Sequence, residues 1–341
     1  MIAIALLGMQ ACRASAPTTA VAEPAVTPTP ASTPAPRSMR RVPIDAPGLF
    51  AEGLAWDAPR SRLLLGGIVG QAIVASDLSA APAQRVAAPA AGWSVFGLAI
   101  DVERGWLWAA CSAVPQGKLL PHDRGRAGLV AFALADGAQI HAWETEDDAG
   151  HVLGDVALAS DGTAYTTDSQ GGGVYAASTD RVALREVMPA GSFRSPQGII
   201  ALDDHALLLA DYSTGLVRVE LDGEGAARSH AVLRSAAGDD LRGVDGIARR
   251  DRTVIAVQNG AAPPRVLAIT LAQDLAGIAA ASVLHVPEVD DGEPTLVTIV
   301  GDDAWVVQTD RWDRVFDGDG RPRGELAIAS PVVLQIPLPG T

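Results

Sequence analysis

The strongest constraint on the fold is a short pattern that occurs six times along the 341-residue chain. In each copy a small residue opens an apolar strand, polar residues make a turn, and a second apolar strand follows. The second residue of each copy and the residue that ends its second strand always lie 13 positions apart. These pairs are Gly53 and Gly66, Gly97 and Ala110, Asp155 and Asp168, Gly198 and Asp211, Gly246 and Asn259, and Val297 and Asp310. A constant step predicts six equivalent hairpins.

The spacing of the copies predicts how the hairpins assemble. Successive copies start 43 to 58 residues apart, and a third strand such as QAIVASDL or GLVAFALADG follows most of them. No long segment has a helical period. Six units of three to four antiparallel strands predict an all-β, six-bladed β-propeller. An open β-solenoid would need shorter and more uniform repeats. We expect the segments 38–45 and 331–339 to bring both ends of the domain into one closing blade.

The first 40 residues differ from the rest of the chain. Residues 1–12 are an apolar run that ends at Cys12, lacks a basic start and is too short to span a bilayer. We interpret them as a signal peptide. Ala11 fits a lipoprotein signal ending at Cys12, whereas Met9 and Gln10 fit it poorly, so an ordinary secretory signal remains the alternative. Residues 13–40 are rich in Pro, Ala and Thr and predict a disordered tether.

This organisation predicts an exported protein with the propeller at residues 41–341. We expect either a periplasmic or outer-membrane lipoprotein tethered through a lipidated Cys12, or a secreted protein. Cys111 is the only other cysteine, so a disulfide framework is not expected, and we predict that Cys111 is buried. Because the edge strands of a closed propeller are short and protected, a monomer is expected.

Charge limits the kind of partner. The formal net charge is −14, and Lys118 is the only lysine. Because a phosphate backbone is bound by clustered basic residues, this composition argues against a nucleic-acid partner. It suits a small-molecule substrate or a cation.

One column of the repeat carries candidate chemistry. The residues that stand just before the aligned small residue are Glu52, Phe96, Gly154, Gln197, Asp245 and Leu296, and Asp155 follows one position later in the third copy. A purely structural ring would place small or apolar residues at all six positions. The carboxylates and the amide supply oxygen ligands, which suit Ca²⁺ and also Mg²⁺ or Mn²⁺, with Zn²⁺ less favoured. The alternative is that each is an ordinary turn residue or a solvated rim charge.

The strand openings EGLAWD, SPQGII and GVDGIA resemble those of the SMP-30/gluconolactonase/LRE-like family, which is more loosely related to paraoxonases. The resemblance covers nearly all of residues 45–341 and implies a six-bladed propeller with a central divalent metal. It implies Glu52, Gln197 and Asp245 as the metal ligands. The chain has Gln197 where the family has an asparagine, and Gly154-Asp155 where it has Asn-Asp. Both differences bear on activity more than on fold.

The same resemblance implies a metal-dependent hydrolase of lactones or esters. Asp245 or Asp155 is then the candidate base that accepts a proton from water. His122 and His151 lie in or just after the longest gap between copies, from which they could reach the channel and bind substrate. The alternative is a non-catalytic propeller that binds a ligand or a protein partner and in which any metal is structural. Asp168, Asp211, Asp310 and Asn259 end second strands, and we predict that they form turn hydrogen bonds.

Overall fold

The computed structural model describes residues 37–146, 149–235, 237–288, 292–323 and 328–339. Residues Ser38–Thr341 form one compact unit. The predicted signal sequence, Cys12 and most of the predicted tether lie outside the described residues. Within the described ranges, no helix is both long enough and apolar enough to cross a bilayer.

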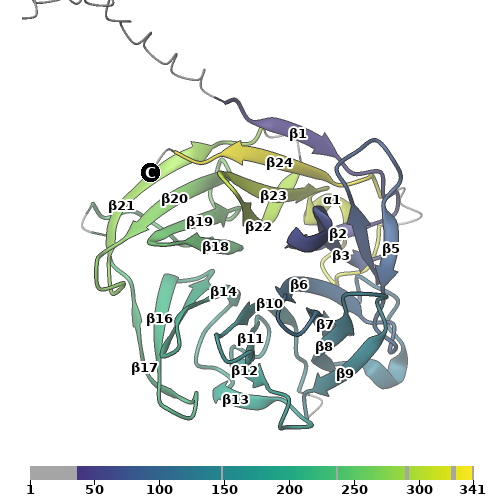
Figure 1. The fold of residues 1–341 in the computed structure, drawn as a ribbon, viewed down its shortest axis with the longest axis horizontal. Helices are drawn as coiled ribbons and strands as arrows, with labels where there is room; N and C mark the ends of the chain where they lie inside the picture. Colours follow the sequence, from purple (N-terminus) through teal and green to yellow (C-terminus); the bar gives the residue numbers. More distant parts are fainter. Residues whose placement is uncertain (1–36, 147–148, 236, 289–291, 324–327, 340–341) are drawn as a thin grey trace, which may run out of the picture. The chain divides into compact units, whose positions relative to one another are not determined.

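The six-bladed propeller predicted from the repeat is confirmed. Figure 1 shows the blades arranged in a ring around a central channel, each one a sheet of four antiparallel strands. Blade 1 holds β2 (Phe50–Asp57), β3 (Arg62–Val69), β4 (Ile73–Ser76) and β5 (Gln84–Ala87). Blade 2 holds β6 (Ser94–Asp101), β7 (Trp106–Ser112), β8 (Ala127–Ala133) and β9 (Gln139–Glu144). Blade 3 holds β10 (Leu153–Leu158), β11 (Ala164–Asp168), β12 (Val174–Ala177) and β13 (Arg185–Met188).

The other three blades repeat this order, with one exchange. Blade 4 holds β14 (Pro196–Asp203), β15 (Ala206–Asp211), β16 (Gly215–Leu221) and β17 (Ala227–Val232). Blade 5 holds β18 (Ile247–Arg250), β19 (Thr253–Gln258), β20 (Arg265–Leu271) and β21 (Ile278–His285). Blade 6 holds β22 (Glu293–Val300), β23 (Asp303–Thr309), β24 (Val332–Pro337) and β1 (Arg40–Pro43). In blade 6 the outermost strand is β1, which pairs with β24 from Arg40–Gln335 to Pro43–Val332.

The helical segments lie in the connections between strands. They are the 3-10 turns η1 (Ala58–Arg60) and η2 (Pro121–Asp123) and the short helix α1 (Trp312–Val315). Of these, α1 matters most for the site, because it follows β23 and lies near the channel in Figure 1.

Apolar residues at alternate strand positions fill the space between neighbouring blades. Leu64 and Ile73 of blade 1 pack with Leu107 and Phe132 of blade 2, and the same arrangement recurs at the other blade interfaces. Cys111 is fully buried, as predicted, and burial raises the pKa of its thiol well above the usual range. Each blade therefore buries its apolar faces only against its two neighbours, which is why the ring must close.

A bulge explains why the candidate column faces the channel. In five blades the ladder between the first and second strands shifts register at the column position, for example between Ala51 and Gly53 and between Pro196 and Ile199. In blade 5 the ladder starts at Ile247, just after Asp245 and Gly246. A bulge bends the strand and re-aims a side chain that regular alternation would point into the sheet.

The recurring small residue has a separate cause. A Cβ on Gly53 would lie 2.1 Å from the carbonyl oxygen of Phe96, and one on Gly246 would lie 2.5 Å from that of Thr295. The innermost strands of successive blades therefore come too close for a side chain at these positions. The Gly246 nitrogen donates to the Thr295 carbonyl at 3.1 Å, which links two adjacent bulges.

Candidate active site

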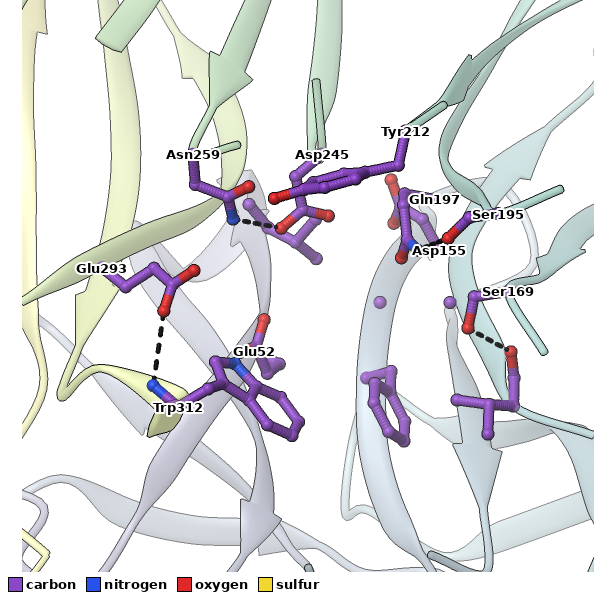
Figure 2. A pocket seen from close by; sticks show the side chains of 15 residues that line it. Glu52, Asp155, Ser169, Ser195, Gln197, Tyr212, Asp245, Asn259, Glu293 and Trp312 are labelled. Atoms are coloured by element: carbon purple, nitrogen blue, oxygen red, sulfur yellow. Dashed lines mark hydrogen bonds between the residues drawn. The ribbon is translucent and has the colours of Figure 1, made fainter. Parts of the chain in front are cut away.

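The bulged column lines one cavity at the channel, with a volume of about 330 Å³. Figure 2 shows side chains from several blades converging on it. Glu52, Gln197, Asp245 and Asp155, which the sequence singles out, all line this cavity. The other members are Phe96, Gly97, Val152, Gly154, Ser169, Ser195, Tyr212, Asn259, Glu293, Leu296 and Trp312. The structure thus brings the four candidates together, and their roles remain predictions.

Glu52 is buried and Asp245 is partly buried, and each accepts a short side-chain hydrogen bond. The indole nitrogen of Trp312 donates to Glu52 Oε1 at 2.7 Å. The amide nitrogen of Asn259 donates to Asp245 Oδ2 at 2.7 Å (Figure 2). One such donor satisfies only a fraction of the acceptor capacity of a carboxylate.

The pKa values of these carboxyl groups reflect their burial and the small number of hydrogen-bond donors around them. Burial raises the pKa of Glu52 well above its usual value, and the charge of Asp245 raises it further, against the opposing bond from Trp312. Burial raises the pKa of Asp245 to about 7, although the Asn259 bond lowers it. Glu293, whose pKa is also raised, adds to this effect on Asp245. The cavity therefore holds several carboxyl groups that ionise at a cost.

Asp155 and Gln197 complete the acceptor set. Burial raises the pKa of Asp155 to about 7, despite the bond that its Oδ1 accepts from the Val156 nitrogen at 2.8 Å. The Gln197 amide nitrogen donates to Ser195 Oγ at 2.8 Å, which fixes the orientation of the amide (Figure 2). The longer side chain of glutamine is accommodated here by this bond to its own blade.

The donor set fits a hard divalent cation in its chemistry. All of the side-chain atoms that could bind a metal are oxygens, and the carboxylates among them place negative charge where few hydrogen-bond donors neutralise it. In addition, Asn259 Oδ1 is buried and makes no hydrogen bond to the described residues. Among the described residues, no group of three or more Asp, Glu, His or Cys side chains lies close enough together to hold a metal ion. A cation here would therefore need amide or water oxygens beside Glu52 and Asp245.

Asn259 was predicted to form turn hydrogen bonds, and this prediction is wrong for its side chain. It ends its strand region like Asp168 and Asp211, but its amide enters the channel, where it bonds to Asp245 and, at 3.2 Å, to the Pro294 carbonyl. The prediction of turn hydrogen bonds is confirmed for Asp168 and Asp211, and that for Asp310 stays a prediction. Asp168 accepts from the nitrogens of Val152 and Gly171 at 3.0 and 2.8 Å. Asp211 likewise accepts bonds from main-chain nitrogens on both sides of its strand end.

The two histidines lie away from the channel cavity. His151 is buried, and its Nδ1 lies 2.6 Å from Asp168 Oδ2. It lines a second cavity that adjoins the first one. His122 lies on η2 with its ring exposed and its Nε2 3.6 Å from Asp123 Oδ2, and it lines neither cavity. The structure thus does not bring His122 to the predicted position.

Sequence reasoning missed Ser169, Tyr212, Glu293 and Trp312. The first two immediately follow Asp168 and Asp211, so the repeat places them at equivalent positions where second strands end. That column could have been inspected in the same way as the strand openings. Trp312 carries no such signal, because it lies in the connection between β23 and β24, and Glu293 opens β22 three positions before the column residue Leu296, outside the column that the repeat singles out.

Comparison with known proteins supports the fold. No family model matches the sequence, and no curated protein matches it. Solved structures do match. A gluconolactonase from Xanthomonas campestris has a TM-score of 0.56 and 15% identity, with 88% of this chain and 90% of that chain covered. Regucalcin, a calcium-binding protein from Agrobacterium tumefaciens, gives 0.57 and 16%, with 88% and 95% covered.

A protein with different chemistry is similar to the same degree. Virginiamycin B lyase from Staphylococcus aureus has a TM-score of 0.54 and 13% identity, with 89% of this chain and 99% of that chain covered. The expected likeness to gluconolactonase structures is therefore present at the level of the fold. At these identities the fold alone is shared, and activity has to be argued from the site.

Proposed function

We propose that this protein is a cation-dependent hydrolase of lactones or esters. The observation that carries the proposal is that Glu52 and Asp245 line one cavity, where desolvation raises the pKa of both carboxyl groups. A divalent cation, most readily Ca²⁺, would offset that cost. Gluconolactonase and regucalcin share the fold, so the proposal agrees with chemistry that this fold is known to carry.

Glu52 and Asp245 would hold the cation, together with the amide oxygens of Gln197 and Asn259. When bound, the ion would polarise a substrate carbonyl and make a bound water more acidic. The indole of Trp312 and the amide of Asn259 each donate to one carboxylate, so both orient these groups for binding.

Asp155 is the better placed candidate for the general base, with Asp245 as the alternative. Its pKa of about 7 lets it accept a proton from water near neutral pH and release it afterwards. Asp245 would be less basic once its charge is shared with a cation.

The test combines binding and turnover. Calorimetry of chelator-treated protein with Ca²⁺ should show a single site, and Asp245→Ala should abolish it. Hydrolysis of γ-valerolactone and p-nitrophenyl acetate by the Ca²⁺-loaded protein should fall at least about a hundredfold in Asp155→Asn. Asp211→Asn, at a buried aspartate outside the cavity, is the matched control and should retain both properties.

A second candidate, ligand binding without catalysis, is favoured by Phe96, Gly154 and Leu296, which leave three of the six column positions without a side-chain oxygen. Ca²⁺ binding with no turnover of any lactone or ester would establish it. Absence of divalent cation binding, with Asp245→Ala leaving any lactone turnover unchanged, would overturn the hydrolase and leave ligand binding without catalysis standing.

We also propose that residues 1–12 direct export and that Cys12 is lipidated, with residues 13–40 as the tether. The support is the sequence pattern. Incorporation of a labelled fatty acid into the protein, lost in Cys12→Ser, would test it. A soluble, unlabelled, exported protein would instead indicate an ordinary secretory signal.

A further inference from the structure

The channel cavity holds more acidic side chains than the proposed reaction uses. Four carboxyl groups line it, and they belong to Glu52, Asp155, Asp245 and Glu293. In the proposed function, two of them would hold the cation and Asp155 would act as the base, which leaves Glu293 without a role. Among the described residues, no lysine, arginine or histidine lines this cavity. A bound divalent cation would therefore leave an excess of negative charge in it.

Glu293 is partly buried at the start of β22, and only one of its carboxylate oxygens accepts a hydrogen bond from the described residues. Its Oε2 accepts from the main-chain nitrogen of Trp312 at 3.3 Å. Figure 2 shows Glu293 across the cavity from Gln197 and Asp155. The second oxygen of Glu293 can therefore accept a bond from a ligand, at a place apart from the proposed base.

Arg311 is the basic residue whose charge acts on Glu293. It lowers the pKa of the Glu293 carboxyl, against the larger effect of burial, whereas Asp313 raises it. The Arg311 guanidinium donates two hydrogen bonds to Asp313, at 2.7 and 3.0 Å, and it does not line the cavity. The charge of Arg311 is thus largely balanced by that of Asp313, and the cavity beside Glu293 keeps its negative charge.

Three aromatic side chains, Phe96, Tyr212 and Trp312, line the same cavity. Burial, and after it the charges of Asp245 and Glu293, raise the pKa of Tyr212 to about 12, so its hydroxyl stays neutral. The face of an aromatic ring attracts a cation, and it also offers apolar surface to the methyl groups of a quaternary ammonium. Rings beside an available carboxylate are suitable surroundings for an organic cation.

We propose that Glu293, together with the rings of Tyr212 and Trp312, forms a subsite for an ammonium group of the substrate. The substrate class would then be esters or lactones that carry a positive charge, rather than ones that carry a carboxylate or a phosphate. The position of the reacting carbonyl, at a cation held by Glu52 and Asp245, rests on the function proposed above. An anionic substrate group would meet the excess negative charge and would be repelled.

Binding can be measured without turnover. Choline and 3,3-dimethyl-1-butanol have the same shape, but only choline is charged. In calorimetry with Ca²⁺-loaded protein, choline should bind at least about tenfold more tightly than the neutral alcohol, because both the carboxylate and the rings attract the ammonium group. Equal affinity for the two ligands would overturn the proposal. Tighter binding of the neutral alcohol would also overturn it, in favour of an uncharged apolar site.

A variant of Glu293 tests the carboxylate. Glu293→Gln keeps the size of the side chain and removes its charge, so choline affinity should fall at least about fivefold, with the affinity for the neutral alcohol within about twofold of wild type. Glu288→Gln is the matched control, because Glu288 is exposed and does not line the cavity, and it should change neither affinity. An unchanged choline preference in Glu293→Gln would contradict the proposal, both with Ca²⁺ and in chelator.

Variants of Tyr212 test the ring without a change of charge. Tyr212→Phe keeps the ring and should bind choline within about twofold of wild type, whereas Tyr212→Leu should weaken choline binding about three- to tenfold. This pair also decides the question if Glu293→Gln does not fold. Equal choline affinity in Tyr212→Phe and Tyr212→Leu would then overturn the proposal.

Turnover separates this inference from the proposed function. Acetylcholine and 3,3-dimethylbutyl acetate are the corresponding charged and neutral esters. Wild type should have a KM for acetylcholine at least about tenfold lower than for the neutral ester, and Glu293→Gln should raise the KM for acetylcholine alone. Preferential choline binding without hydrolysis of either ester would overturn the hydrolase and leave the ammonium subsite standing. Hydrolysis of both esters with equal KM would overturn the subsite and leave the hydrolase standing.

Discussion

Asp168 is fully buried at the end of β11 and Asp245 is partly buried just before β18, and the two carboxylates have different hydrogen-bond partners. Asp168 accepts bonds from main-chain nitrogens, including those of Val152 and Gly171, and its other oxygen lies 2.6 Å from His151 Nδ1. Asp245 receives one side-chain bond from Asn259, and its pKa is raised to about 7. The difference teaches that the number of donors, rather than burial, decides whether a carboxylate is structural or available to a ligand.

Blades 4 and 5 show the same contrast, between a structural role and a role in the channel, at the residue that ends or directly follows the second strand of each blade. Asp211 ends the second strand of blade 4 and accepts main-chain bonds that close its turn. Asn259 stands at the same position in blade 5 but donates into the channel instead. An amide can donate to a carboxylate, whereas a second carboxylate would repel it. Because blade 5 has asparagine where blade 4 has aspartate, this position contributes to the channel cavity in blade 5 and to the turn in blade 4.

The largest expected effect is on Asp168. Asp168→Ala should destabilise the protein by about 4 kcal/mol, because it leaves several buried main-chain donors and His151 without their acceptor. Urea unfolding in the presence of chelator measures this change. Asp245→Ala under the same conditions should be neutral or stabilising, since it removes an ionisable group that burial penalises. Equal destabilisation by both variants would contradict the distinction between a structural Asp168 and an Asp245 that is available to a ligand.

The next effect depends on pH and concerns Asp155. Its pKa is raised from 3.8 to about 7 in the folded protein, so the unfolded chain releases this proton first as pH rises. The stabilising contribution of the protonated group is fully present below the unfolded pKa and is lost as pH rises through the folded pKa. Wild type should therefore lose about 4 kcal/mol relative to Asp155→Asn over this window in chelator. Urea unfolding at several pH values measures it, and a difference independent of pH would argue against the raised pKa.

A smaller effect is expected at Trp312. Trp312→Phe keeps a ring but removes the donor to Glu52 Oε1, which disfavours the ionised carboxylate that a cation needs. Ca²⁺ affinity measured by calorimetry should fall about tenfold, and the pH at which binding appears should rise. Trp305→Phe is the control, because the buried Trp305 Nε1 has no partner among the described residues. Similar affinities for both variants would show that the indole bond does not tune Glu52.

The smallest effect sharpens the contrast between blades 4 and 5. Asn259→Asp introduces the residue type that blades 3, 4 and 6 have at this position, so a pure turn role would leave stability unchanged or improved. We expect instead a loss of about 1 kcal/mol in chelator at mildly alkaline pH, because a new carboxylate would face Asp245. Added Ca²⁺ should reverse the loss. Thermal unfolding with and without Ca²⁺ would detect both changes.

Much of the fold was predictable because the repeat is local. The constant step between strand openings and strand ends, together with Gly53 and Gly246, predicted six hairpins in register. The column that contains Glu52 and Asp245 was also predictable, since equivalent positions of a closed ring face one channel. Asn259 was assigned to turn chemistry because the pattern shows position but not side-chain direction. His122 was placed near the channel only because it lies in a long connection.

The sequence by itself determined the blades and the column, because hydrophobic alternation and tight turns act over a few residues. Only the tertiary structure decided which carboxylates lack partners, since donors such as Trp312 come from distant connections. It also decided the second cavity, which forms where the connection between β7 and β8 packs against the one between β23 and β24. Desolvation and the shape of a cavity depend on contacts between residues that are far apart in the sequence, and a local sequence pattern does not contain this information.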